Sequence, residues 1–198
     1  MMRWAGSLVF WGFVAISSKQ AVGATLTLAV TRAGRPLVVK LTLAAAIDDL
    51  KKWKLYFTDR PAPDFNLSLV NRGGSVSLAA KRGKPVLLFF WSTDCDSCKL
   101  ILRNYLPGLH KELSGRGLEF LGIGLDKNVD TLRKAALSFG LPFDTAHFPR
   151  ADYLRAYKNT SKPVLILVDR QGYVREYVVG SDYRQGWLRS LALKVMSR

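Results

Sequence analysis

Continuous apolar runs mark three places along the chain where strands are expected. Residues 84–91, KPVLLFFW, and residues 117–126, GLEFLGIGLD, are runs of strand length, which is typical of strands covered on both faces. Residues 162–180 hold two further apolar runs separated by Gln171-Gly172, a dipeptide suited to a tight turn. The pattern therefore predicts two buried strands followed by an antiparallel hairpin.

Between and after these strands, apolar residues recur at helical spacing. The four segments are residues 97–113, 129–140, 151–159 and 183–196. Pro107 is expected to kink or break the first segment, and Gly140 to stop the second. Strands that alternate with helices and end in a hairpin predict an α/β fold, with a sheet of mixed direction flanked by helices.

The first residues have the three-part pattern of a secretory signal. Arg3 precedes an uncharged run over residues 4–18, and a polar stretch then ends in small residues near Ala24. A transmembrane helix needs about 20 apolar residues, and Lys19 ends this run early. We therefore expect residues 1–24 to be a signal peptide, with a membrane anchor as the alternative, and the protein to be exported to the periplasm or tethered outside the cytoplasm.

The next segment, residues 25–43, alternates apolar and polar side chains on both sides of Ala33-Gly34 and predicts a β-hairpin. It resembles the last hairpin of a PDZ domain over these residues alone, without a carboxylate-binding loop or groove, so no peptide-binding function is inferred. A lone hairpin is marginal in water, and we expect it to pack on the main domain or a partner, or to be a remnant. The expected domains are residues 1–24, the hairpin with a short helix and linker over 25–60, and the main domain over 61–198.

Charge changes this picture little. The chain of 198 residues has 30 Lys and Arg against 15 Asp and Glu, a formal charge of +15 and a pI near 10.1. An anionic partner or surface is conceivable on this basis. However, the cations are scattered, and no basic block interleaved with aromatic residues marks a nucleic-acid groove. We therefore expect no nucleic-acid partner.

The two cysteines of the chain, Cys95 and Cys98, directly follow the run at residues 84–91. They fall where a strand gives way to a helix and lie one helical turn apart, within reach of a disulfide. A thiol at a helix N-terminus is stabilised as thiolate, because it faces unpaired N–H groups and the positive end of the helix dipole. Cys95 is therefore the expected nucleophile and Cys98 the resolving thiol.

From residue 61 onward the chain resembles the thioredoxin fold, and more closely the exported TlpA/ResA-type thiol-disulfide oxidoreductases, which overlap the redoxin (AhpC/TSA) group. The matching segments are APDF, KRGKPVLLFFWST, the C-x-x-C pair followed by Lys99, and SKPVLILVDRQGYV. The resemblance implies exchange with extracytoplasmic protein disulfides or dithiols, an unidentified redox partner and no cofactor. It also implies that Pro163 is a cis-proline beside the disulfide, with Lys162 and Trp91 next to the substrate; for Trp91, packing beside the site is the favoured role.

Several residues depart from the family pattern. The family has Trp before the first cysteine and Pro before the second, where this chain has Asp94 and Ser97. Many members have an acid or amide two positions before the conserved Trp, where this chain has Phe89. Asp94 and Asp96 are therefore the remaining candidates for proton handling at the resolving thiol.

The same two carboxylates are expected to oppose thiolate formation at Cys95, and Lys99 to offset them in part. Destabilising the thiolate disfavours the reduced form, so the sequence predicts a reducing couple rather than a strongly oxidising one. Lys162, where the family has small or β-branched residues, leaves the choice of substrate open.

The cysteines could in principle belong to a metal site instead of an exchange site. A zinc site would need Cys95 and Cys98 with His110 and His147, but these histidines lie on unrelated elements far apart in the sequence. A copper site would need a third ligand, for which His147 is the candidate, although a polar loop histidine is the simpler interpretation. We therefore expect no metal.

Two alternatives stay open from the sequence. A redoxin-type peroxidase would use Cys95 as the peroxidatic thiol, with Ser92 and an arginine such as Arg150 nearby, but no proline precedes Ser92 at that family's spacing. A non-catalytic thioredoxin-like binding module would keep the disulfide only as a structural link. Resistance of the disulfide to reduction would distinguish the second alternative from a working redox site.

Overall fold

The computed structural model describes residues 25–32, 35–42, 49–180 and 185–198 and divides the chain into two units, Met1–Ile47 and Asp48–Arg198. In the first unit, β1 (Thr25–Arg32) and β2 (Arg35–Thr42) pair antiparallel, which confirms the predicted hairpin. The predicted signal peptide lies outside the described residues. Among the described residues, no helix has the length and apolar character needed to cross a membrane.

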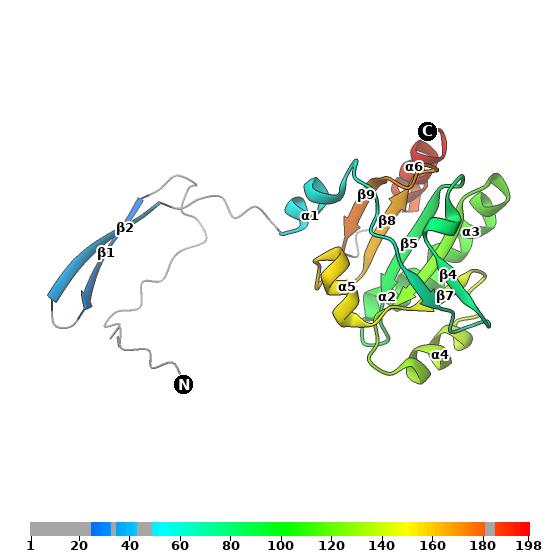
Figure 1. Cartoon of the computed structure of the whole chain (residues 1–198), viewed down its shortest axis with the longest axis horizontal. Coiled ribbons are helices and arrows are strands. Elements are labelled where there is room, and N and C mark those ends of the chain that lie inside the picture. The colour runs from blue at the N-terminus through cyan, green and yellow to red at the C-terminus, as the bar shows by residue number, and fades with distance from the viewer. Residues whose placement is uncertain (1–24, 33–34, 43–48, 181–184) are drawn as a thin grey trace. The chain divides into compact units, whose positions relative to one another are not determined.

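The second unit is built on a five-stranded mixed sheet in the order β7-β6-β5-β8-β9 (Figure 1). The strands are β5 (Val86–Trp91), β6 (Glu119–Gly124), β7 (Asp144–His147), β8 (Val164–Val168) and β9 (Val174–Val179). The first three run parallel, whereas β8 is antiparallel to both β5 and β9. A small antiparallel pair, β3 (Asn66–Ser68) with β4 (Ser75–Ser77), lies outside this sheet.

Helices cover both faces of this sheet. They are α1 (Asp49–Phe57), α2 (Asp96–Asn104), α3 (Leu106–Leu113), α4 (Val129–Ser138), α5 (Arg150–Tyr157) and α6 (Gln185–Met196), with short 3-10 turns at Ala79–Lys81 and Ser114–Arg116. The break predicted at Pro107 is present: α2 ends at Asn104, and the proline lies in the first turn of α3, where its missing N–H costs no hydrogen bond.

Strand β5 explains why its sequence is apolar at every position. Side chains alternate across a strand, so Leu87, Phe89 and Trp91 enter one core with α2, α3 and α6. Leu88 and Phe90 enter a second core on the opposite face, with α1, α5 and the β3–β4 pair. The predicted fold class, a mixed α/β sheet flanked by helices, is confirmed.

The boundary of the main unit differs from the expected one at residue 61. Phe57 of α1 is buried and stacks on Tyr177 of β9, with ring centroids 5.4 Å apart. Its neighbour Asp59 forms an ion pair with Arg175, also on β9. Helix α1 therefore packs into the second unit, whereas the sequence grouped this short helix with the hairpin and linker, because the contacts that hold it come from residues more than a hundred positions later.

Candidate active site

Cys95 and Cys98 form a disulfide at the start of α2, shortly after the end of β5, with an S–S distance of 2.05 Å. Cys95 is the N-cap of α2, with extended backbone angles, and its Sγ accepts a hydrogen bond from the backbone N–H of Cys98 at 3.1 Å. The sulfur thus occupies the position that an N-cap oxygen usually takes. A negative charge on this sulfur would be stabilised by the N–H group and the helix dipole.

The two sulfurs differ in exposure. Cys98 is fully buried within the core that β5 shares with α2, whereas Cys95 is partly exposed at the edge of the same core. A substrate can therefore reach Cys95 first.

The loop before β8 lies beside the disulfide. The Lys162–Pro163 peptide bond is cis. Val164 pairs with Phe90 in antiparallel register, and continuing that register by one residue places Pro163 opposite Trp91, at the end of β5 from which the cysteine loop leaves. The backbone N–H of Gly180 donates to the carbonyl of Pro163 at 3.0 Å, which ties this loop to the end of β9.

The buried amide side chain of Asn159 is hydrogen-bonded to the same loop. Asn159 donates through Nδ2 to the hydroxyl of Tyr177 at 2.8 Å, and its Oδ1 accepts from the backbone N–H of Ser161 at 2.8 Å. Asn159 and Tyr177 are both buried, and burial raises the pKa of Tyr177 to about 12. The tyrosine therefore stays protonated and can hold the amide across the physiological pH range.

Asp94 and Lys162 form an ion pair with 2.6 Å between Oδ1 and Nζ. The hydroxyl of Ser92 also donates to Oδ1 of Asp94. The hydrogen bond from Lys162, followed by that from Ser92, lowers the pKa of Asp94 to about 2. Asp94 is therefore fully ionised at neutral pH.

The candidates for proton handling are both weak bases. Asp96 forms an ion pair with Lys99 at 2.8 Å, which lowers its pKa, and its side chain is 95% exposed. A general base works best when its pKa lies near the operating pH, and the pKa values of Asp94 and Asp96 are shifted away from that range. These shifts make proton acceptance by either carboxylate less favourable at neutral pH, and their role in proton handling stays a prediction.

Trp91 and Phe89 are fully buried side chains of β5. Trp91 packs against Phe139, with ring centroids 5.8 Å apart, and presents no surface that a substrate could contact. This burial favours the packing role of Trp91 over the alternative of a substrate contact. Phe89 stands where the family resemblance implies an acid or amide. Its apolar side chain instead contributes volume to the core that also contains Cys98.

The residues weighed for other chemistry lie apart from the disulfide or are already engaged. His110 packs against the rings of Phe120 and Phe143, and Nε2 of His147 contacts the backbone carbonyl oxygen of Asp126 at 2.8 Å. In the part of the chain that the structure describes, no three His, Cys, Asp or Glu side chains gather as a metal site would require. Ser92, the hydroxyl expected for a peroxidase, is committed to Asp94.

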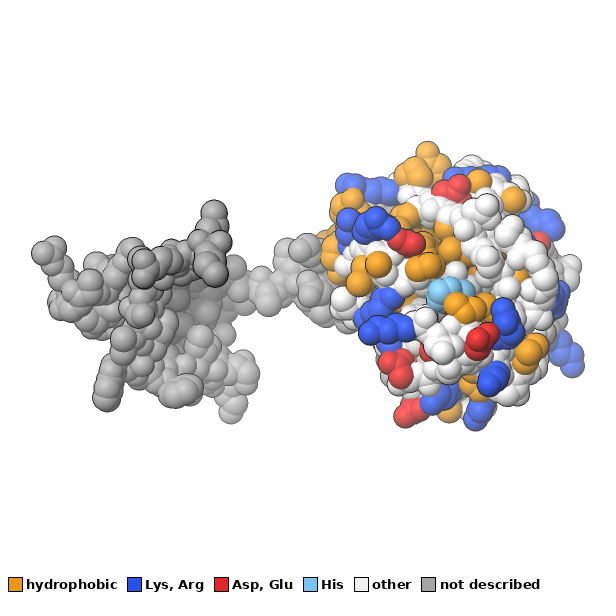
Figure 2. Space-filling view, turned by 60° about the horizontal axis from the view of Figure 1, so that its bottom comes forward, with side chains coloured by type: hydrophobic (Ala, Val, Ile, Leu, Met, Phe, Trp, Pro, Cys, Tyr) orange, Lys and Arg blue, Asp and Glu red, His pale blue; other side chains and the backbone are white. Residues whose placement is uncertain are grey.

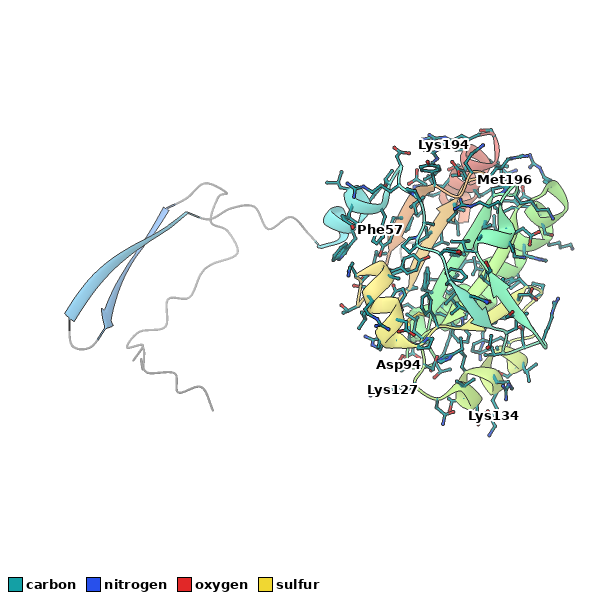
Figure 3. All side chains as sticks on the ribbon, viewed as in Figure 1. Phe57, Asp94, Lys127, Lys134, Lys194 and Met196 are labelled. Atoms are coloured by element: carbon teal, nitrogen blue, oxygen red, sulfur yellow. A yellow bond between two sulfur atoms is a disulfide. The ribbon has the colours of Figure 1, made fainter. Side chains whose placement is uncertain are left out.

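The site lies at one end of the second unit. Figure 3 shows Asp94 and Lys127 at the end opposite Lys194 and Met196. Figure 2, turned to bring that end forward, shows Lys and Arg side chains spread around the face and separated by hydrophobic and uncharged surface. The cations are thus dispersed here, as the sequence indicated, rather than gathered into a groove.

Sequence patterns missed several residues that shape the site. Asp126 accepts from the backbone N–H of Thr93 at 3.0 Å and from its hydroxyl, which fastens the cysteine loop to the end of β6. Ser92, Asn159 and Tyr177 act in the contacts described above. A polar residue two positions after the end of a buried strand, as Thr93 and Asp126 are, was the available signal; the tyrosine had none.

Three comparisons place the chain among known proteins. The AhpC/TSA family model matches residues 58–177. The thiol-disulfide oxidoreductase ResA of Geobacillus kaustophilus is 31% identical over 130 residues, covering 66% of this chain and 74% of that protein. ResA of Oceanobacillus iheyensis is 27% identical over 163 residues, covering 79% and 84%.

Among solved structures, the thioredoxin domain of a thiol-disulfide oxidoreductase from Bacteroides vulgatus superposes with a TM-score of 0.62 at 25% identity, covering 70% of this chain and 97% of that one. Residues 58–177, which the family model matches, contain strands β3 to β8, the C-x-x-C helix and the cis-proline loop described above. The chain therefore belongs to the AhpC/TSA family, as a thioredoxin-like thiol-disulfide oxidoreductase of the ResA type.

Proposed function

We propose that the protein exchanges disulfides with protein substrates outside the cytoplasm, with Cys95 as the attacking and Cys98 as the resolving thiol. The observation that carries these roles is the placement of the pair. Cys95 is partly exposed, caps α2 and accepts the N–H of Cys98, while Cys98 is buried one turn below. These features favour a thiolate at the sulfur that a substrate reaches first.

In the reducing direction, the Cys95 thiolate attacks one sulfur of a substrate disulfide. A mixed disulfide forms, and the other substrate sulfur leaves as a thiolate that takes up a proton. The Cys98 thiol then loses its proton and attacks Sγ of Cys95, which releases the second substrate thiol and forms the Cys95–Cys98 disulfide. Two electrons thus pass from the protein to the substrate. An unidentified dithiol partner must then reduce the Cys95–Cys98 disulfide again.

Pro163 and Lys162 are proposed to form the edge on which the substrate chain binds. Among the described residues, Lys162 lies outside the regular strands, and its N–H and C=O take part in no backbone hydrogen bond. Such groups can pair with an extended peptide, as an added strand pairs with a sheet edge. The partly exposed sulfur of Cys95 would then lie beside the substrate cysteine.

The direction of electron flow and the location are further parts of the proposal. We retain a reducing couple as the prediction, although Lys162 and Lys99 pair with the carboxylates on which it was based. The signal-like pattern of residues 1–24 supports export, by cleavage or with the segment kept as an anchor. Cell fractionation, with N-terminal sequencing of the mature protein, tests the location.

The test of function is the reduction potential of the Cys95–Cys98 pair in the full chain, measured by equilibration against glutathione or dithiothreitol buffers. A value within the range of known exchange proteins is expected. The variant Cys98→Ala should accumulate mixed disulfides through Cys95, whereas the matched Cys95→Ala should not, because its remaining thiol is buried. A pair that stays oxidised throughout and traps nothing would make the disulfide a structural link and the protein a binding module.

A further inference from the structure

One ion pair joins the two loops that frame the disulfide. Lys162 directly precedes the cis-proline, and Asp94 directly precedes Cys95, yet they lie 68 residues apart in the sequence. Nζ of Lys162 and Oδ1 of Asp94 are 2.6 Å apart. The pair therefore places a cation and an anion side by side at the sulfur that reacts.

The charges near Cys95 come from its own loop, the first turn of α2, the segment after β6 and the cis-proline loop. They are Asp94, Asp96, Lys99, Asp126, Lys127 and Lys162. Three of these six side chains, those of Asp94, Asp96 and Lys127, are exposed, so water and salt screen them. The side chain of Lys162 is only 18% exposed, against 35% for Lys99. Lys162 is thus the better shielded of the two lysines that form ion pairs beside Cys95.

The partner of Lys162 is held in a fixed place. The carboxylate of Asp94 also accepts from the buried hydroxyl of Ser92, so it does not depend on the lysine alone for its orientation. Asp94 is the covalent neighbour of Cys95, and neighbouring Cα atoms lie about 3.8 Å apart. Without Lys162, an unpaired negative charge would remain on the residue adjacent to the one on which another negative charge must form.

We propose that the Lys162–Asp94 ion pair sets the reactivity of Cys95, with Lys162 as a positioning residue that neutralises Asp94 next to the reacting sulfur. This inference rests on the proposed exchange function and specifies how the site is regulated by its own charges. It accounts for two departures from the family pattern together: the aspartate before the first cysteine is matched by the lysine before the cis-proline.

The proposal predicts opposite effects of the two partners. Lys162→Met leaves Asp94 unpaired, and the pH midpoint of Cys95 alkylation should rise by about half to one pH unit, equivalent to about a three- to tenfold loss of thiolate below the midpoint. Asp94→Asn leaves the lysine unpaired, and the midpoint should fall by a similar amount. The double variant should return to within about twofold of the wild type.

The measurement uses the reduced full chain with Cys98→Ala as background, so that iodoacetamide reports on Cys95 alone, across a pH series. The chain that retains both cysteines supplies a second readout, the equilibrium between disulfide and dithiol in glutathione buffers. Lys162→Met should shift this equilibrium toward the disulfide, and Asp94→Asn should shift it toward the dithiol. Lys162→Arg keeps the charge and should preserve the wild-type midpoint. The matched control is Lys84→Met, which removes a lysine paired with Glu119 at the opposite end of β5 and should leave the midpoint unchanged.

A purely mechanical role of the pair gives a different result. If the ion pair only fastened the two loops, both single variants would shift in the same direction and the double variant would not recover, which would overturn the proposal. Equal midpoints in all variants would also overturn it. Asp94 is 74% exposed, so Asp94→Asn keeps the test decisive even if Lys162→Met folds poorly. A wild-type chain that exchanges with no thiol would instead refute the proposed function itself.

Discussion

Tyr177→Phe tests whether the buried amide behind the cis-proline loop holds that loop in place. The change removes one oxygen and keeps the ring that stacks on Phe57. It leaves Nδ2 of Asn159 without the partner that now lies 2.8 Å away, inside a site where both residues are buried. Because Asn159 also fixes Ser161, the loss is expected to reach the loop that carries Lys162.

The size of the effect follows from this burial. A hydrogen bond between neutral groups contributes about 1 kcal/mol net, but a buried donor left unpaired costs about 1–3 kcal/mol, so we expect a loss of about 2 kcal/mol. For a unit of the size of Asp48–Arg198, this corresponds to a fall in Tm of about 4–8 °C. Disulfide exchange should slow as well, since the substrate edge becomes less ordered.

Urea and thermal denaturation of the oxidised full chain measure the first effect, and the rate of reduction by dithiothreitol measures the second. Tyr173→Phe is the matched control, because Tyr173 is 39% exposed and its change should alter stability by less than about 0.5 kcal/mol. If Tyr177→Phe were as stable as this control, the amide would not be held through the hydroxyl, and the reasoning would be refuted.

Two further predictions concern the frame of the site. Asp169 is buried and, although burial raises its pKa, hydrogen bonds from backbone N–H and from Arg175 lower it overall. The contribution of ionised Asp169 to the free energy of unfolding is therefore present above the unfolded pKa of about 3.9 and is lost as the pH falls through the lower folded pKa. Urea unfolding across pH 2–6 should show that Asp169→Asn loses less stability on acidification than the wild type. An equal loss in both proteins would contradict this prediction. In Gly124→Ala, the new Cβ would lie 2.8 Å from Cγ of the buried Leu132 and closer to its methyl carbons, so we expect a loss of about 1–3 kcal/mol by chemical denaturation; Gly122→Ala, with its nearest contact at 3.1 Å, should cost less, and the reverse order would show that the Leu132 side chain moves aside.

The parts of the site that the sequence predicted depend on short-range patterns. The run before Cys95, the spacing to Cys98 and the proline that opens β8 all lie within a few residues of one another or within a recognisable family motif. Local order of this kind is visible in a single sequence because strand and helix periodicity act over neighbouring residues.

The missed features depend on contacts between distant segments. No local pattern pairs Lys162 with Asp94 or Asn159 with Tyr177, because tertiary packing alone brings these side chains together. Strand β7, DTAH, was missed because a four-residue edge strand with few apolar side chains shows no period-2 pattern. Only one of the two ion pairs that lower the pKa values of Asp94 and Asp96 is of this distant kind, the Lys162–Asp94 pair, whereas Lys99 lies three residues from Asp96.

Strand β5 lies between two cores, and every one of its side chains is buried. Segments of this kind exchange their backbone hydrogens only when the whole unit opens, whereas a loop with exposed side chains opens by itself. The cysteines are thus attached to a fully buried strand through a short segment that includes the partly exposed Thr93 and the exposed Asp94. Repeated cycles of oxidation and reduction can therefore take place in a short turn at the end of this strand while the strand itself stays closed to solvent and proteases.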